Sequence, residues 1–236
     1  MRTLALWLVL VAGPVSAGTC PVPKGGSEKL AAVDSDVRAG RLQEWLWHDS
    51  HTAHLWNVVW IGANAALTVI QGVGAPFFTM PDRADWVVGA ISTAVNALGY
   101  AVFAIDVPAP TAANYDHSCD ALADLEAKAQ VGHDSEAFGI SFWSHLLCIG
   151  LSVVPGLVLG LAYDRWVSGA LLTAGGIVLG ELAIITTPTG LMHHYEGYLA
   201  GDPIDLSPEV IQAVSLAPVM RDGRATGLQL ALSGSF

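Results

Sequence analysis

Two apolar stretches of this chain decide its fold. Residues 139–160 read GISFWSHLLCIGLSVVPGLVLG, and residues 166–187 read WVSGALLTAGGIVLGELAIITT. A helix needs about 20 mainly apolar residues to cross a bilayer, and residues 52–73 and 86–107 are two further stretches of that kind. The short turn AYDR joins the quoted pair, so each pair is expected to fold as a hairpin. The sequence therefore predicts an all-α membrane protein with four transmembrane helices in two duplicated hairpins.

The composition fits a chain with a lipid-facing surface. Of its 236 residues 53% are hydrophobic and 13% are charged, with a mean hydropathy of +0.49, whereas a typical soluble domain has about 25% charged residues. The net charge of −11 lies mainly outside the apolar stretches. Such an acidic chain excludes a nucleic-acid binder of the basic-patch kind. The lipid bilayer is the expected partner.

The amino terminus has the pattern of a secretory signal peptide. Arg2 precedes the apolar run from Leu4 to Ala12, and small residues follow up to Ala17, which is the order of regions in such signals. Export would leave both mature ends outside the cytoplasm, with the helices in a bacterial inner membrane. The predicted segments are the signal peptide 1–17, an extracytoplasmic segment 18–51, the first hairpin 52–107, an acidic extracytoplasmic loop 108–138, the second hairpin 139–187 and an extracytoplasmic tail 188–236.

The two predicted hairpins resemble each other. The second helix of the first hairpin begins DWVVGA at Asp85, and that of the second hairpin begins RWVSGA at Arg165. At the same offset Thr93 matches Thr173. Each unit has an even number of spans, so the sequence predicts a parallel internal repeat, related by an axis along the membrane normal.

The second half also resembles a known family. EAFGISFWSHLLCIG, GLVLGLAYDRWVSGAL and GELAIITTPTG, all within residues 135–190, together look like a family of small four-span bacterial membrane proteins with no known activity. The resemblance implies the four-span architecture. It brings neither a catalytic residue nor a ligand.

Polar side chains within the apolar stretches form the first candidate site, because an ionisable group in hydrocarbon is costly and usually faces the bundle interior. Glu181 lies six residues before the outer end of its predicted helix, and His145 lies six residues after the outer start of its own. The two should share one depth and could pair. Asn57, Asn64 and Tyr100 are expected nearby. One interpretation is an outward polar chamber for a cation or proton; the other is interhelical hydrogen bonding that only holds the helices together.

A second candidate site precedes the first apolar stretch. Glu44, His48, His51 and His54 recur at steps of four, three and three, which places them along one side of a helix. Such ligands can bind a divalent transition metal, so a metal site stays open as one interpretation. The alternative is that these histidines, beside several tryptophans, belong to the headgroup belt of a membrane helix.

The outer segments carry two structural signals. Cys20 and Cys119 both fall on the expected oxidising side, where a disulfide can form, whereas Cys148 should be a free thiol. Alternating apolar runs flank Asp222-Gly223 in the tail, which predicts a small β-hairpin. This hairpin could pack on the helix bundle, on the acidic loop, on another copy of the chain or on another membrane or periplasmic protein.

Three functions are compatible with these features. The first is a non-enzymatic membrane protein that binds or conducts a small cation or proton through an outward-facing polar chamber. The second is a structural or accessory subunit that presents an external interaction surface. The third is a metal-dependent membrane enzyme that uses the histidine ladder, although no residue can be assigned a catalytic role.

Overall fold

The computed structural model describes residues 20–110, 118–202, 211–221 and 224–234, and the side chains of the first two ranges. The predicted signal peptide and the Asp222-Gly223 turn lie outside the described residues. In chain order the elements are α1 (Glu28–Ala31), α2 (Ser35–Gly74), a 3-10 turn (Ala75–Phe77), α3 (Asp82–Val102), α4 (Cys119–Gly139), α5 (Phe142–Tyr163), α6 (Trp166–Ile185), α7 (Gly190–Ala200), β1 (Ile211–Arg221) and β2 (Arg224–Gly234).

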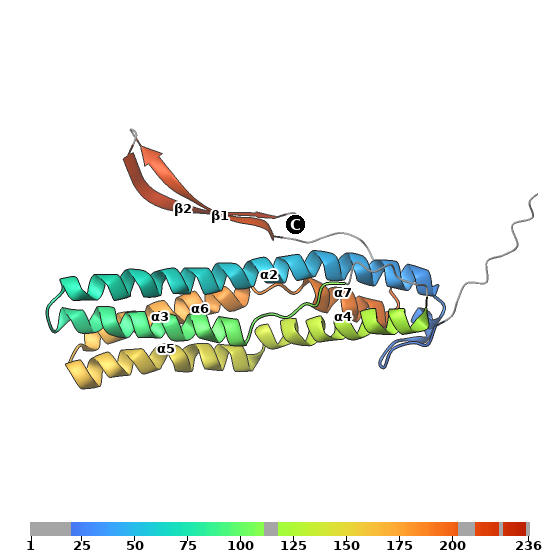
Figure 1. Cartoon of the computed structure of the whole chain (residues 1–236), viewed down its shortest axis with the longest axis horizontal. Coiled ribbons are helices and arrows are strands. Elements are labelled where there is room, and N and C mark those ends of the chain that lie inside the picture. Colours follow the sequence, from blue (N-terminus) through green and yellow to red (C-terminus); the bar gives the residue numbers. More distant parts are fainter. Residues whose placement is uncertain (1–19, 111–117, 203–210, 222–223, 235–236) are drawn as a thin grey trace, which may run out of the picture.

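The helices form one elongated bundle (Figure 1). Its two ends are built from different helices and are called the first end, or apolar end, and the second end. At one end α2, α3, α5 and α6 lie side by side, and at the other end α4 and α7 continue the lines of α5 and α6 beside the first half of α2. α4 ends at Gly139 just before α5, and α6 ends at Ile185 just before α7. α2 runs unbroken through both ends.

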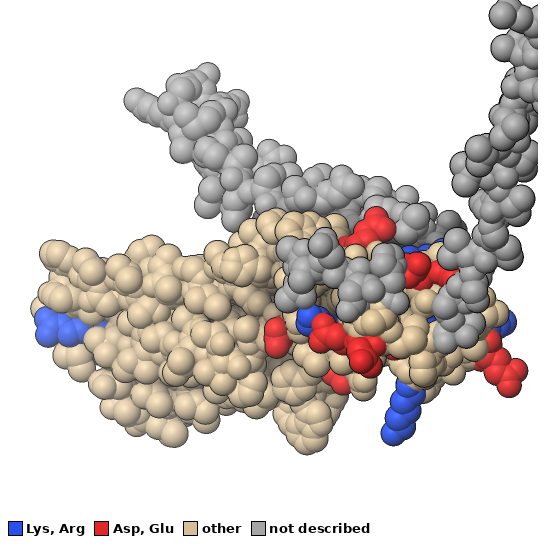
Figure 2. Space-filling model, turned by 45° about the vertical axis from the view of Figure 1, so that its right-hand side comes forward, with Lys and Arg blue, Asp and Glu red and all other residues tan. Residues whose placement is uncertain are grey.

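Helix length and apolar surface mark the first end as membrane-spanning. Among the described residues, three helical segments are long and apolar enough to cross a membrane: Ser35–Phe77, Phe142–Tyr163 and Trp166–Ala200. α3, α5 and α6 have 21, 22 and 20 residues, so at 1.5 Å per residue each is about 30 Å long, the thickness of a bilayer core. Figure 2 shows this end almost free of charge, with charged side chains gathered over α4, α7 and the start of α2 and at the opposite tip.

Small residues bring α5 and α6 into close contact. A side chain added at Gly169 would lie 2.4 Å from the carbonyl oxygen of Gly156, and one added at Gly180 would lie 2.3 Å from Cys148 Sγ. Ser152 faces Gly176 in the same row. Because lipid does not drive helices together as water does, such close backbone approach is the usual means of holding membrane helices.

The second end of the bundle has a core of its own, built on a seven-residue repeat. On α4 the buried positions follow steps of three and four: Leu122, Leu125, Ala129, Gly132 and Glu136. On the first half of α2 the buried positions include Leu42, Leu46, Asp49 and Ala53, again at steps of four, three and four. α7 adds Leu191, Tyr195 and Tyr198. This spacing keeps one side of each helix towards its neighbours, so three helices bury a common core.

A buried ion pair ties this core to the start of the described chain. Arg38 is 1% exposed; its guanidinium contacts Glu126 Oε1 at 2.5 Å and donates to the Tyr198 hydroxyl oxygen at 3.0 Å. It also donates to the carbonyl oxygens of Cys20 and Pro21, each at 3.1 Å. Cys20 and Cys119 form the disulfide that the sequence allowed, with Cα atoms 5.3 Å apart.

The expectation of a four-helix fold is wrong. The described chain has six helices of eleven residues or more, because α4 and α7 occupy segments that were expected to be an acidic loop and a tail. Residues 118–131 of the acidic loop predict only a short amphipathic helix, whereas α4 extends to Gly139. The apolar residues of α4 and α7 lie on one side of each helix and pack against α2. β1 and β2 follow as an antiparallel pair in which Leu216 lies opposite Leu230.

The buried ion pair gives a test of this second core. Arg38→Ala should lower the free energy of unfolding by about 3–5 kcal/mol, because Glu126 would stay buried without its cation. The double variant Arg38→Met with Glu126→Leu should recover much of that loss. Denaturant unfolding in detergent micelles measures both. Arg41→Ala, at a partly exposed cation on the same helix, is the matched control, and an equal loss in Arg38→Ala and Arg41→Ala would contradict the assignment.

Candidate functional site

His145 and Glu181 meet between α5 and α6. His145 Nδ1 lies 2.7 Å from Glu181 Oε2, and the two side chains are 39% and 29% exposed. Each lies about one turn from the end of its helix that faces α4 and α7. The contact of Gly180 with Cys148 holds the two backbones close at this depth. The structure thus brings together the two residues that the sequence placed at one level.

Further polar and aromatic side chains surround this pair. The Cys148 thiol donates to the Ile177 carbonyl oxygen at 3.9 Å, and it interacts electrostatically with Glu181 and with Tyr100 of α3. The Tyr100 ring packs against the rings of Trp56 and Trp60 of α2, with centroids 5.8 and 6.0 Å away. α2, α3, α5 and α6 therefore each contribute to one polar and aromatic layer near the junction of the two ends.

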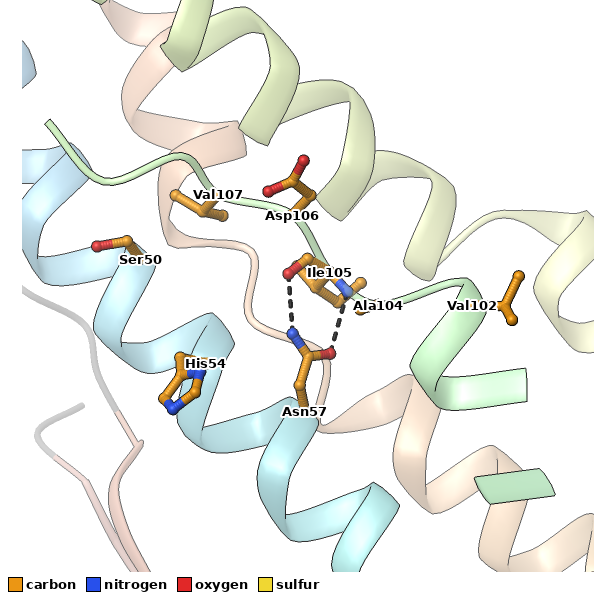
Figure 3. A pocket seen from close by; sticks show the side chains of 8 residues that line it. All are labelled: Ser50, His54, Asn57, Val102, Ala104, Ile105, Asp106 and Val107. Atoms are coloured by element: carbon orange, nitrogen blue, oxygen red, sulfur yellow. Dashed lines mark hydrogen bonds between the residues drawn. The ribbon is translucent and has the colours of Figure 1, made fainter. Parts of the chain in front are cut away.

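Asn57 has a different role from the one expected. Its side-chain amide donates to the Ile105 carbonyl oxygen at 2.9 Å, and its side-chain oxygen accepts from the Ile105 amide at 3.0 Å (Figure 3). This pair of bonds holds the extended segment that follows α3 against α2. Asn64 donates to the Trp60 carbonyl oxygen of its own helix at 2.9 Å.

A cavity of about 440 Å³ lies beside Asn57, between α2 and the segment after α3 (Figure 3). Its lining comprises Ser50, His54, Asn57, Val102, Ala104, Ile105, Asp106 and Val107. Neither Glu181 nor His145 lines it. Of the polar residues expected around one chamber, Asn57 therefore lines this cavity and Tyr100 lies near the His145–Glu181 pair, while Asn64 bonds within its own helix.

The histidine ladder lies on α2 with its side chains exposed: Glu44, His48, His51 and His54. His48 Nδ1 contacts the neighbouring Asp49 at 2.9 Å, and His54 borders the cavity. Within the described part of the chain, no group of three or more His, Cys, Asp or Glu side chains is placed to hold a metal ion.

Two buried carboxylates, Asp49 and Glu136, were missed from the sequence. Asp49 is 3% exposed, and its two oxygens contact Nδ1 of His48 at 2.9 Å and Nδ1 of His194 at 3.3 Å. Trp45 stacks on the His194 ring with centroids 5.1 Å apart. Glu136 is 0% exposed. Both occupy apolar positions of the seven-residue repeat, which is the signal that could have revealed them.

A further ion cluster ties the two hairpins together at the opposite tip. Arg165 donates through Nε to Asp85 Oδ1 at 2.8 Å and through Nη2 to Asp85 Oδ2 at 2.6 Å, and its Nη1 lies 2.9 Å from Asp82. Ser168 donates to Asp85 at 3.0 Å. Paired bonds of this kind fix the relative orientation of two groups, so α3 and the start of α6 are held together there.

Comparisons with protein-family models, with curated proteins and with solved structures found no match to this chain. The resemblance to a four-span family and the internal repeat therefore stay predictions. The site has to be interpreted from its own geometry.

Asn57 offers a test of how the junction is held. Asn57→Leu should expose the Ile105 amide to hydrogen exchange and cost about 1–3 kcal/mol, because the Ile105 amide and carbonyl would lose their partners. Amide hydrogen exchange of residues 104–107 measures the effect. Asn96→Leu is the matched control, since Asn96 has no hydrogen-bond partner among the described side chains. Unchanged exchange in Asn57→Leu would show that the segment is held by other contacts.

Proposed function

We propose that this chain is an integral membrane protein that binds a proton or small cation at His145 and Glu181, near the outer surface of the membrane. The contact of 2.7 Å between their side chains carries the proposal. An ionisable pair within apolar helices is costly to retain, and imidazole is the side chain whose charge changes most readily near neutral pH. The pair sits where α5 and α6 leave the apolar end, so an ion from outside would reach it without crossing the bilayer.

The orientation of the chain follows from the chemistry of its second end. The disulfide between Cys20 and Cys119 belongs to the end built from α4 and α7, and structural disulfides persist in oxidising compartments. The proposal therefore puts this end outside the cytoplasm, together with both mature termini, and puts the tip with Arg165 inside. A bacterial inner membrane and a cleaved signal peptide belong to the same proposal.

A structural or accessory role is a second candidate, favoured by a different observation. The buried Arg38–Glu126 pair, its bonds to the chain near Cys20 and the disulfide make the outer end a firmly connected unit. Such a unit on a membrane anchor could present a surface to another protein. It needs no ion at His145.

Glu181→Gln separates these two functions. The protein in lipid films would be examined by infrared difference spectroscopy while the pH or the concentration of Na⁺ or K⁺ is stepped. The wild-type difference spectrum should contain one carboxylate component that is missing from the spectrum of Glu181→Gln, because the amide cannot ionise. Glu28→Gln, at an exposed carboxylate outside the apolar end, should keep it.

Two results would contradict ion binding at the pair. One is the same carboxylate change in Glu181→Gln as in the wild type, which would assign the change to another residue. The other is the absence of any change in the wild type at every pH and with both cations. Either result would favour the accessory role.

A further inference from the structure

Among the described residues, Glu136 is a buried carboxylate that lacks both a paired cation and a full set of hydrogen-bond partners. Its side chain is 0% exposed; Oε2 accepts from the Met192 amide at 2.8 Å, while Oε1 has no hydrogen-bond partner. No ion pair joins it to a lysine or arginine within the described part of the chain. A buried polar atom without a partner is uncommon and costly, so the site calls for a ligand on Oε1.

The groups that act directly on the Glu136 carboxylate are Asp49 and the backbone amides of Leu191 and Met192. From α2 comes Asp49, whose oxygens contact His48 and His194. α7 supplies the Leu191 and Met192 amides to Glu136, and its His194 lies against Asp49. Asp106 belongs to the segment after α3, and its backbone amide donates to Ser135, the neighbour of Glu136, at 2.8 Å.

Electrostatics decides what ligand this carboxylate takes. Two like charges that share a buried site cannot both persist without a counter-ion. Asp49 has two histidines against it and Glu136 has none. Glu136 is therefore the carboxylate whose negative charge must be neutralised by a ligand. Because no third acidic, histidine or cysteine ligand completes a metal site in the described residues, the ligand is a proton.

We infer that Glu136, Asp49 and the first turn of α7 form a proton-binding site outside the membrane, distinct from the His145–Glu181 pair. The reaction is the addition of one proton to the Glu136 carboxylate, with the proton on Oε1, and its release to the outside solution. Burial raises the pKa of Glu136 to about 8. The hydrogen bond from the Met192 amide opposes this rise, and repulsion from Asp49 adds to it. The site is therefore occupied at neutral pH.

Occupancy of this site affects how α7 packs. When the proton leaves, Glu136 becomes an anion beside Asp49, and the two carboxylates repel each other across the contact of α4, α2 and the first turn of α7. A side chain added at Gly190 would lie only 2.9 Å from Asp49 Oδ1, so α7 begins directly against this pair. Proton release thus weakens the packing of α7 at the point where it continues α6.

Infrared spectroscopy of the full chain in lipid tests the inference. Wild-type protein at pH 7 should show the C=O stretch of a protonated carboxylic acid, and this band should disappear with a midpoint near pH 8. Glu136→Gln should lack the band, whereas Glu28→Gln should retain it. Asp49→Asn should keep the band and move its disappearance to lower pH, because the negative charge of Asp49, which disfavours the Glu136 anion, is removed.

Other outcomes separate this site from the proposed function. Glu181→Gln should leave the band and its midpoint unchanged, so failure of the membrane site and failure of this one are told apart. A wild-type spectrum without the band at pH 7, or a band that persists in Glu136→Gln, would overturn the inference. So would an Asp49→Asn midpoint equal to that of the wild type.

The pH dependence of stability gives a second measurement with a defined sign. The pKa of Glu136 rises from 4.5 for a free side chain to about 8 in the fold, so the folded state binds the extra proton between these values. Its contribution to stability is therefore present below about pH 4.5 and is lost as pH rises towards 8. Relative to Glu28→Gln, Glu136→Gln should lose this slope between pH 5 and 8, and an unchanged slope would contradict the assignment.

Discussion

The unbroken α2 helix places an apolar environment and an aqueous one on a single rigid axis. Its 40 residues are about twice the length that a bilayer core requires, while α3, α5 and α6 each match that length once. The other helices therefore break or end near one level. α4 ends at Gly139, just before α5 begins, α6 ends at Ile185, and α3 ends at Val102. The polar pair, the cavity and the two buried carboxylates all lie near this level, because it is where side chains can be ionised and still packed.

The core formed by α4, α7 and the first half of α2 holds two pairs of charged residues, and the two pairs differ in how their charges are neutralised. Arg38 and Glu126 are of opposite charge and share Tyr198, so their buried charges neutralise each other. Asp49 and Glu136 have the same charge, and only Asp49 has histidines against it. The first arrangement stabilises one packing of the helices. By our inference, the second makes the packing depend on a proton, a response that an apolar core of the same shape would lack.

Part of this structure could be predicted from the sequence, and the limits are physical. The apolar stretch 166–187 became α6 (Trp166–Ile185), and counting residues from the helix ends brought His145 to Glu181. The stretch 86–107 was too long at its end, because Asn57 holds residue 105 in an extended segment, a contact that no local pattern encodes. Asp49 and Glu136 were missed because a carboxylate suggests solvent, and only its position in a seven-residue repeat shows that tertiary packing buries it.

The position along α2 at which lipid gives way to water decides which side chains lie in the membrane. In a Cys148→Ser background, spin labels introduced one at a time at exposed positions of α2 would report collisions with oxygen, which concentrates in lipid, and with a water-soluble nickel chelate. The positions are Glu44, His51, Leu55, Val59 and Val69. The account predicts water at the first two, lipid at the last two and the crossover near Leu55. Access to the nickel chelate at all five positions, or a crossover at the far end of α2, would contradict it.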